Sequence, residues 1–311
     1  ASIAPCDPAV SFTPERLRAA LESAFAEIAG PTAGSCIALS GGLDSTVLLA
    51  GIAELAGRGN VAPWQPVRAI HVDHGLHRDA VRWSEHSASV ARSLGIGCEI
   101  VRVDARPAAG ESPEAAARAA RYRALAERLR TGEVLLTAHH ADDQLETVLL
   151  QWLRGGGLRS IAGMSPVAPF ARGAHARPLL AFTRDELRDW ARAAGLEWLE
   201  DPSNVDTRFD RNYLRLEVLP AVLRRWPAAA RTVGRVAAQT AEALELDAEA
   251  AAADLAAARE AETLSLPVMR VLAPSRQRRL LRAWLRGAGL PIPAAATLEA
   301  LRRDVLAAAG D

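Results

Sequence analysis

Lysine is absent from this chain of 311 residues, and all 37 basic residues are arginine. A Walker A loop, a pyridoxal Schiff base and a catalytic lysine each require a lysine side chain, so the sequence excludes all three. Cysteine is scarce as well: the chain has three, Cys6, Cys36 and Cys98, which are far apart and form no CxxC pair. This pattern argues against a disulfide framework, a zinc ribbon and an iron–sulfur cluster.

Long apolar runs are also missing. No stretch approaches the roughly 18 apolar residues that a membrane span needs, and the first residues lack the basic and apolar segments of a secretion signal. The composition, with 50% hydrophobic and 24% charged residues, is otherwise that of a globular protein. We therefore expect a cytoplasmic protein that makes no contact with membranes.

Charge is balanced overall but is unevenly distributed along the chain. Acidic and basic residues number 37 each, which argues against indiscriminate coating of nucleic acid. Residues 204–235 hold seven arginines and three acids, residues 242–262 hold seven acids and one arginine, and residues 270–286 hold six arginines and no acid. Such blocks are often solvated helix faces, and the alternative is a binding surface, for which we select 270–286.

The first half of the chain alternates short β-type runs with helical segments. Strands are predicted at residues 36–40, 67–72, 98–103 and 133–137. Helix starts are predicted at Thr13, Ser112 and Thr183, where a capping hydroxyl precedes Pro in the first turn or Glu at the third position. The alternation is typical of a parallel α/β sheet.

The second half of the chain is less regular and then becomes helical. A stretch rich in Gly and Pro, residues 154–178, is expected to lead away from the sheet. Beyond Pro220 the pattern is almost entirely helical. We predict an α/β domain over residues 1–220 and a separate helical domain over residues 221–311. Helices are predicted near residues 184–194, 275–286 and 297–307.

The strongest chemical motif is Ser40-Gly-Gly-Leu-Asp-Ser45, which follows a predicted strand directly and precedes an apolar helical run. A small glycine-containing turn of this kind lets backbone N–H groups approach a phosphate at a helix N-terminus. A carboxylate facing phosphates is repelled unless a divalent cation lies between them, so Asp44 implies Mg²⁺. By the residues alone, an ordinary capped turn is an equal alternative.

This motif resembles the PP-loop of the ATP pyrophosphatases, which cleave ATP between the α- and β-phosphates. Further segments, in their order and spacing, resemble the tRNA(Ile)-lysidine synthetase family, and the resemblance runs from about Ser35 to Pro220. These segments are His71-Val-Asp-His-Gly-Leu76, His139-His-Ala-Asp-Asp-Gln-Leu-Glu-Thr147 and Asp201-Pro-Ser-Asn204 with Arg211-Asn-Tyr-Leu-Arg215. The resemblance implies a Rossmann-like parallel sheet of the adenine nucleotide alpha hydrolase type, which makes residues 1–220 the PP-loop, ATP-binding catalytic domain. It also implies that the helical C-terminal domain, residues 221–311, binds tRNA.

The activity that the resemblance implies joins free L-lysine, through its ε-amine, to C2 of the wobble cytidine of an isoleucine tRNA with a CAU anticodon. ATP first adenylates the C2 oxygen with release of pyrophosphate, and lysine then displaces AMP. ATP and Mg²⁺ are thus the implied cofactors, and tRNA and lysine the implied partners. The oligomeric state stays open, a homodimer being one option.

The resemblance also implies roles for individual residues. The expected catalytic residues are Asp44, Asp143, Glu146, Arg118 (with Arg121 as its alternative) and Arg211. The expected nucleotide-binding residues are Ser40, Gly41, Gly42, Leu43, Asp44, Ser45 and His71, and the expected metal ligands are Asp44 and Asp143. Asp143 and Glu146 lie one helical turn apart, away from an apolar stripe, so both can face a cleft. Whether they hold Mg²⁺, bind the lysine ammonium or accept a proton stays open.

Other interpretations compete with this one. A different PP-loop tRNA-modifying enzyme, such as a thiolase, would need a cysteine pair that the chain lacks. A non-catalytic nucleotide- or RNA-binding module would not need three carboxylates. A zinc site at His71, His74, His139 and His140 would lack Cys partners and an HExxH helix. Longer family members continue into a second C-terminal domain, so we expect either a short-form enzyme or part of a longer protein.

Overall fold

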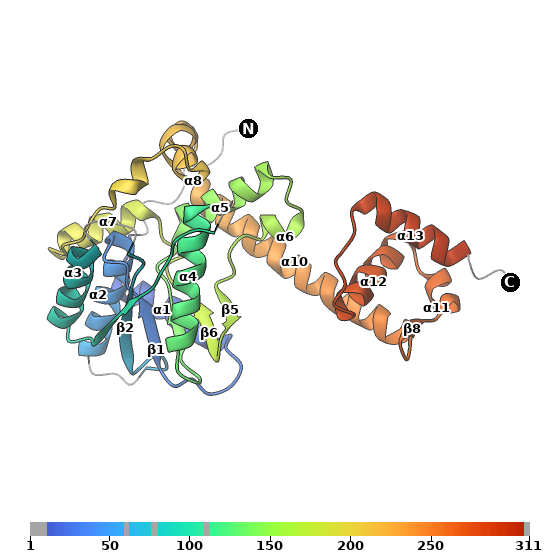
Figure 1. The fold of residues 1–311 in the computed structure, drawn as a ribbon, viewed down its shortest axis with the longest axis horizontal. Helices are drawn as coiled ribbons and strands as arrows, with labels where there is room; N and C mark the ends of the chain where they lie inside the picture. Colours follow the sequence, from blue (N-terminus) through green and yellow to red (C-terminus); the bar gives the residue numbers. More distant parts are fainter. Residues whose placement is uncertain (1–10, 59–61, 76–79, 109–111, 308–311) are drawn as a thin grey trace. The chain divides into compact units, whose positions relative to one another are not determined.

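The computed structural model describes residues 11–58, 62–75, 80–108 and 112–307 (Figure 1). The chain divides into two compact units, Ala1–Ala238 and Gln239–Asp311, here called unit 1 and unit 2. The sequence analysis placed the domain boundary after residue 220, whereas the observed boundary lies inside a long helix, α10 (Ala229–Ala258). Over the described ranges, no helix combines the length and the apolar character of a membrane span.

Unit 1 is built on a six-stranded sheet with the order β3-β2-β1-β4-β6-β5 (Figure 1). The strands are β1 (Ser35–Ala38), β2 (Val67–Asp73), β3 (Cys98–Arg102), β4 (Val134–Leu136), β5 (Val167–Phe170) and β6 (Gly173–Ala176). β1 pairs in parallel with both β2 and β4. The chain leaves β1 toward β2 and β3 and returns on the other side as β4. Open α/β sheets bind ligands at such a switch point, outside the carboxyl ends of the strands.

Helices cover both faces of this sheet. The core that contains Ile37 of β1 is formed with α1 (Pro14–Ala26), α2 (Leu43–Gly57), α3 (Ala80–Ser93) and α7 (Arg184–Ala193). The core that contains Cys36 of β1 is formed with α4 (Pro113–Arg128). Successive residues of a strand point to opposite faces, so the buried pair Cys36 and Ile37 serves one core each. Burial raises the pKa of the Cys36 thiol to about 12, which fits the predicted role of a small core residue.

The remaining elements of unit 1 surround the carboxyl end of β4. They are α5 (Ala141–Leu153), α6 (Leu158–Ile161), the 3₁₀ turn η1 (Pro202–Val205), α8 (Asp210–Tyr213), the π-helical turn η2 (Leu214–Val218) and α9 (Leu219–Arg225). Leu145 of α5 packs with Leu219 of α9 and Ala230 of α10 in a small apolar cluster. This cluster holds the segment after residue 200 against α5.

The predicted strands and helix starts are largely confirmed. The hydroxyl of Thr13 accepts a hydrogen bond from the amide of Arg16 at 3.3 Å. Thr183 and Glu186 form the reciprocal capping box that their spacing predicts. Ser112 also precedes a helix, but its side chain makes no capping hydrogen bond. The predicted strands all form, each with ends within two residues of the expected range.

The prediction for residues 154–178 was wrong, because this stretch returns to the sheet. β5 and β6 form an antiparallel hairpin, and β6 continues the sheet in parallel beside β4. Pro169 lies in β5, the edge strand, where a missing N–H group is tolerated. Two four-residue strands between Gly and Pro residues carry too little periodicity to be recognised from sequence.

Unit 2 is helical, as predicted. Its elements are the last part of α10, the short strands β7 (Arg259–Glu260) and β8 (Thr263–Leu264), α11 (Leu266–Val271), α12 (Pro274–Gly287) and α13 (Ala295–Ala307). The buried core includes Met269, Leu280, Leu281 and Leu298. The helices predicted at 275–286 and 297–307 correspond to α12 and α13 within two residues.

Candidate active site

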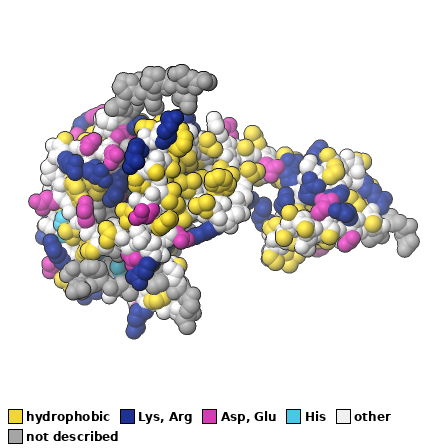
Figure 2. Space-filling model, turned by 90° about the horizontal axis from the view of Figure 1, so that it is seen from above, with side chains coloured by type: hydrophobic (Ala, Val, Ile, Leu, Met, Phe, Trp, Pro, Cys, Tyr) yellow, Lys and Arg dark blue, Asp and Glu magenta, His cyan; other side chains and the backbone are white. Residues whose placement is uncertain are grey.

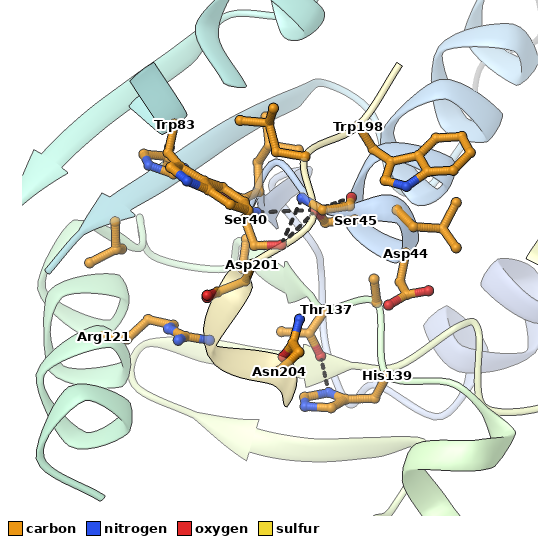
Figure 3. A pocket seen from close by; sticks show the side chains of 18 of the residues that line it. Ser40, Asp44, Ser45, Trp83, Arg121, Thr137, His139, Trp198, Asp201 and Asn204 are labelled. Atoms are coloured by element: carbon orange, nitrogen blue, oxygen red, sulfur yellow. Dashed lines mark hydrogen bonds between the residues drawn. The ribbon is translucent and has the colours of Figure 1, made fainter. Parts of the chain in front are cut away.

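A pocket of about 580 Å³ opens at the switch point of the sheet (Figure 3). Loops after β1, β2 and β4 line it together with α4 and the segment 198–205. The predicted site residues that line the pocket are Ser40, Gly42, Leu43, Asp44, Ser45, His71, Arg118 and Asp143. Gly41, Glu146 and Arg211 are not part of the lining, but they bond to Leu199, Arg215 and Asp143, respectively, which are. The structure therefore brings most of the predicted site residues to one pocket.

Residues 40–45 form a tight turn between β1 and α2. The amide of Ser40 donates to Ser45 Oγ at 3.1 Å, and the two serine hydroxyls lie 2.9 Å apart. Gly41 has φ +80°, and a Cβ there would lie 2.7 Å from Ser87 Oγ, so both backbone and space require glycine. Gly42 is the N-cap of α2, and no side chain caps that end. A helix N-terminus of this kind suits a phosphate group.

Asp44 brings a carboxylate oxygen without a hydrogen-bond partner to the pocket wall. Its Oδ1 atom is buried and bonds to no residue that the structure describes. The nearest cationic atoms are Arg184 Nε, 3.9 Å from Oδ1, and His140 Nε2, 3.7 Å from Oδ2. Burial raises the pKa of Asp44, and these two neighbours offset only part of that effect. The carboxylate is therefore incompletely compensated within the protein.

His140 caps the N-terminus of α5 and lies among three carboxylates. Its backbone amide donates to Asp143 Oδ2 at 3.1 Å in a reciprocal capping box. Its ring nitrogens lie 3.4 to 3.7 Å from carboxylate oxygens of Asp142, Asp143 and Asp44. Burial would lower the pKa of His140, but the carboxylates, above all Asp143, outweigh burial and raise it. The sequence analysis considered His140 only as a zinc ligand, although its place before Asp142 and Asp143 marks it as a cap.

Asp143 and Glu146 share two arginines from the segment after residue 210. Arg211 donates from Nε to Glu146 Oε2 at 2.6 Å and from Nη2 to Asp143 Oδ1 at 2.9 Å. Arg215, on the π-helical turn η2, donates to both oxygens of Glu146, at 2.8 and 3.0 Å. Glu146 is 1% exposed, whereas Asp143 lines the pocket. The two carboxylates lie together as their spacing predicts, but only Asp143 faces the cleft.

The electrostatic setting keeps Asp143 charged. Burial opposes ionisation, yet His140 and Arg211 outweigh it and lower the pKa of Asp143. The apolar side of α5 is only partly buried, because Leu145 and Val148 are buried but Trp152 is 62% exposed. The acidic face of α5 is therefore fixed by its arginine partners as much as by apolar packing.

The opposite wall of the pocket comes from β2, α3 and α4. His71 Nδ1 lies 2.9 Å from the carbonyl oxygen of Leu39, and burial lowers the pKa of His71. The guanidinium of Arg118 lies over the ring of Tyr122, 5.0 Å from its centroid. Trp83 stands over the loop at Ser40 (Figure 3). An aromatic ring and arginines beside a phosphate-binding turn are suited to a nucleotide.

Several pocket residues were missed by sequence reasoning. They include Trp83, Thr137, Arg184 and Trp198. None belongs to a motif with a recognised mechanism, and each comes from a different element. The segment at Trp198 reaches the loop because the amide of Leu199 donates to the carbonyl of Gly41 at 3.0 Å. Such contacts join residues about 160 positions apart, which leave no local signal.

The described ranges contain no group of three His, Cys, Asp or Glu side chains that could hold a metal ion. Three of the four histidines of the zinc interpretation are engaged separately: His71 with Leu39, His139 with Thr137, and His140 with the carboxylates of α5. Mg²⁺ differs from zinc in this respect, because it commonly takes one or two protein carboxylates together with substrate phosphates and water.

Two family models match this chain. Residues 15–222 match the PP-loop domain, and residues 264–311 match the TilS substrate binding domain. The first match covers the switch-point pocket, and the second covers the part of unit 2 from β8 onward.

Curated relatives named tRNA(Ile)-lysidine synthase align along most of the chain. The protein of Alkalilimnicola ehrlichii is 47% identical over 91% of this chain, that of Methylococcus capsulatus 45% over 88%, and that of Coxiella burnetii 40% over 96%. The aligned part spans 63%, 62% and 65% of these relatives, respectively, so the chain corresponds to less than two thirds of their length.

A solved structure shares the fold. The U34-tRNA thiolase NcsA from Methanococcus maripaludis, with its [4Fe-4S] cluster, matches with a TM-score of 0.58. The match covers 73% of this chain and 78% of that protein at 16% identity. It confirms the predicted fold class, a mostly parallel α/β sheet.

Proposed function

The chain belongs to the PP-loop family, as a relative of the tRNA(Ile)-lysidine synthases, and on this basis we propose that it ligates L-lysine to a tRNA nucleotide. The substrate is a tRNA(Ile) with a CAU anticodon, and the reacting atom is C2 of its wobble cytidine. ATP is converted into AMP and pyrophosphate. One observation carries the proposal: the phosphate-binding turn and the Asp143 carboxylate, from two separate helices, line the same pocket.

The proposed reaction has two steps. In the first, the C2 oxygen of cytidine attacks the α-phosphorus of ATP, an O–P bond forms and pyrophosphate leaves. In the second, the ε-amine of lysine attacks C2, a C–N bond forms, the C–O bond breaks and AMP leaves with the oxygen. Adenylation is needed because a carbonyl oxygen is a poor leaving group, whereas AMP is a good one.

We assign the phosphates of ATP to the turn at residues 40–45. The uncapped N-terminus of α2 supplies N–H groups, and the hydroxyls of Ser40 and Ser45 lie beside it. Asp44 fits a Mg²⁺ ligand, because its buried Oδ1 has no hydrogen-bond partner in the described structure. Asp143 is a weaker candidate, since Arg211 already bonds to it. Bound Mg²⁺ would neutralise phosphate charge next to these carboxylates.

We assign different roles to the two carboxylates of α5. Asp143 is charged and faces the pocket, so it is the better partner for the ammonium group of lysine. Its contact with Arg215, at 3.5 Å, is the longest in the cluster, so this contact is the first that an incoming ammonium would replace. Glu146 is buried and bonds to both arginines, so its role is to hold Arg211 and Arg215 in place.

We assign tRNA contacts in unit 2 to fewer arginines than the sequence suggested. Of the six arginines in 270–286, Arg276 and Arg279 bind Asp254, Arg278 binds Glu299 and Arg270 binds the carbonyl of Leu306. Figure 2 shows acidic side chains interspersed with the arginines on this unit. Arg282 and Arg286, both exposed, bond to no residue in the described part of the chain. These two are the arginines best placed to bind phosphate.

The test is incorporation of radiolabelled lysine into an unmodified CAU-anticodon tRNA(Ile), with ATP and Mg²⁺. We expect incorporation that requires ATP and releases AMP. A tRNA(Ile) transcript with uridine at the wobble position is the matched control and should stay unlabelled. Labelling without ATP, or equal labelling of the uridine transcript, would contradict the proposed reaction. If no tRNA were labelled, the result would favour the alternative that the protein is a non-catalytic nucleotide- or RNA-binding module.

A further inference from the structure

A chain of hydrogen bonds runs from the end of strand β6 to the pocket. Arg177 Nη2 lies 3.0 Å from His175 Nδ1, and His175 Nε2 lies 2.8 Å from Thr137 Oγ1. Thr137 Oγ1 in turn lies 2.7 Å from His139 Nδ1, as Figure 3 shows. We call these four residues the His139 relay. His175 belongs to β6, and Thr137 follows β4, so the pairing of β4 with β6 brings them together.

The relay has only one consistent direction for its protons. A guanidinium can only donate, so His175 Nδ1 must accept from Arg177. Burial lowers the pKa of His175 to about 3, so this ring is neutral at pH 7 and carries its proton on Nε2. That proton is donated to Thr137 Oγ1. Within the described part of the structure the hydroxyl of Thr137 has no third hydrogen-bond partner, so the only acceptor for its own proton is His139 Nδ1.

The same reasoning fixes the last member of the relay. Burial lowers the pKa of His139 to about 4, with Arg177 adding to the effect and Asp143 opposing it. His139 is therefore neutral, accepts at Nδ1 and carries its proton on Nε2. Across the described ranges, no residue bonds to His139 Nε2, and His139 lines the pocket. The pocket thus receives an uncharged N–H donor.

Packing holds the middle of the relay in one orientation. The ring of His175 packs in a three-ring cluster with those of Tyr122 and Phe170, whose centroids are 5.9 and 5.8 Å away. Thr137 and His175 are both buried. Reversing the hydrogen bonds would put N–H of His175 against N–H of Arg177, which removes a buried hydrogen bond.

We propose that the relay presents His139 Nε2–H to a hydrogen-bond acceptor of the tRNA nucleotide or ATP at the reacting centre. Arg177, His175 and Thr137 are positioning residues, and His139 is the group that touches substrate. The proposal rests on the proposed function. The acceptor is an oxygen or unprotonated nitrogen, either on the edge of the cytosine or on the α-phosphate.

The first test needs no substrate and stands apart from the proposed function. Protein with ¹⁵N-labelled histidine is measured by NMR at pH 7, with His139→Gln and His175→Gln used for assignment. We expect both rings to be neutral with the proton on Nε2. In Thr137→Val, which removes the hydroxyl at similar size, the His139 signals should shift toward a mixture of tautomers. Thr137→Ser should keep the wild-type signals. A proton on His139 Nδ1 in the wild type, or unchanged signals in Thr137→Val, would overturn the relay.

The second test measures kinetics of lysine incorporation. Thr137→Val should lower kcat about tenfold, as expected for one weakened hydrogen bond in the transition state, and Thr137→Ser should restore it. In His139→Gln, a higher KM for tRNA alone identifies the base as the acceptor, and a higher KM for ATP alone identifies the phosphate. Unchanged kcat and KM in both Thr137→Val and His139→Gln would refute contact with substrate. Absence of activity in the wild type would refute only the proposed function, because the NMR test is independent.

Discussion

Two clusters of carboxylates and arginines, one in each unit, differ in how completely their charges are paired. In unit 2, Asp254 accepts hydrogen bonds from Arg276 and Arg279, and Glu299 accepts them from Arg278 and Arg302. In unit 1, Glu146 is paired as fully by Arg211 and Arg215, but the nearby Asp44 is not. In unit 2 both carboxylates of the cluster are therefore paired with arginines, whereas in unit 1 one carboxylate, Asp44, is not.

The pKa directions follow the same division. The side-chain hydrogen bond from Arg302 lowers the pKa of Glu299 to about 2, and that from Arg276 lowers the pKa of Asp254. Burial instead raises the pKa of Asp44, whose neighbours are too distant to bond. A carboxylate whose pKa is raised by burial inside a pocket is typical of a functional site, whereas a carboxylate that is fully paired with arginines is typical of a structural ion pair. The predictions below test this difference.

The largest expected effect is on catalysis by Asp44→Asn. Removing this carboxylate should lower lysine incorporation by about 10²- to 10³-fold, the usual range for loss of an electrostatic group at a reacting centre. Asp185→Asn, at an exposed carboxylate of α7, is the matched control and should keep wild-type activity. Near-normal incorporation by Asp44→Asn would remove the metal-linked role of this residue.

The stability of Asp44→Asn should not fall. Because burial raises the folded-state pKa of Asp44, its charged form opposes folding at pH 7, and the neutral amide removes that opposition. The thermal midpoint should equal or exceed that of the wild type at pH 7. This advantage should vanish below pH 3.8, the ordinary pKa of Asp, where the carboxyl is protonated in both states. A large loss of stability at pH 7 would show that the charged Asp44 makes stabilising interactions in the folded protein.

The second effect is on the stability of unit 1 in Glu146→Gln. This change removes the buried carboxylate that Arg211 and Arg215 bind most closely and leaves them only Asp143, so we expect the free energy of unfolding to fall by about 3 kcal/mol. Asp254→Asn in unit 2 should cost less, because Arg276 is 52% exposed and can be hydrated, and Arg279 keeps its ion pair with Asp247. Denaturant titration of both variants measures the difference. Equal losses would argue that both clusters are structural in the same way.

The third effect is on tRNA binding. Arg282→Ala combined with Arg286→Ala should reduce the slope of log affinity against log salt by about 1.4 to 1.8, the value for two lost phosphate contacts. Arg18→Ala with Arg92→Ala, on α1 and α3, is the control and should leave the slope unchanged. Filter binding at several salt concentrations gives the slope. If the control lowered it as much, the phosphate contacts would not be specific to unit 2.

The smallest effect is a pH dependence in unit 2. The folded-state pKa of Glu299 is about 2, below the ordinary 4.5, so its ion pairs stabilise the fold above pH 4.5 and are lost as the pH falls toward 2. Glu299→Gln should therefore lower the thermal midpoint by a few degrees at pH 7, by much less at pH 2, and by nothing once the pH is well below 2. Calorimetry across this range measures the gap between variant and wild type, and a gap that stays constant with pH would contradict the assignment.

Local features were predictable because they depend on neighbouring residues. The turn at 40–45, the cap at Thr183 and the strand before each loop follow from backbone geometry and from short-range periodicity. Asp143 and Glu146 share one face because α5 has the regular helical repeat. The β5–β6 hairpin was missed because its strands are short and are stabilised by pairing, β6 with the distant β4 and β5 with β6.

The sequence by itself determined which chemical groups the protein has and where on the chain they follow a strand or begin a helix. The tertiary structure decided which of those groups meet. Glu146 is enclosed because η2 brings Arg215 to it across 69 positions, and His139 has a fixed tautomer because β4 pairs with β6. Strand register and helix packing determine which side chains come into contact, and both depend on interactions among residues that are distant in the chain.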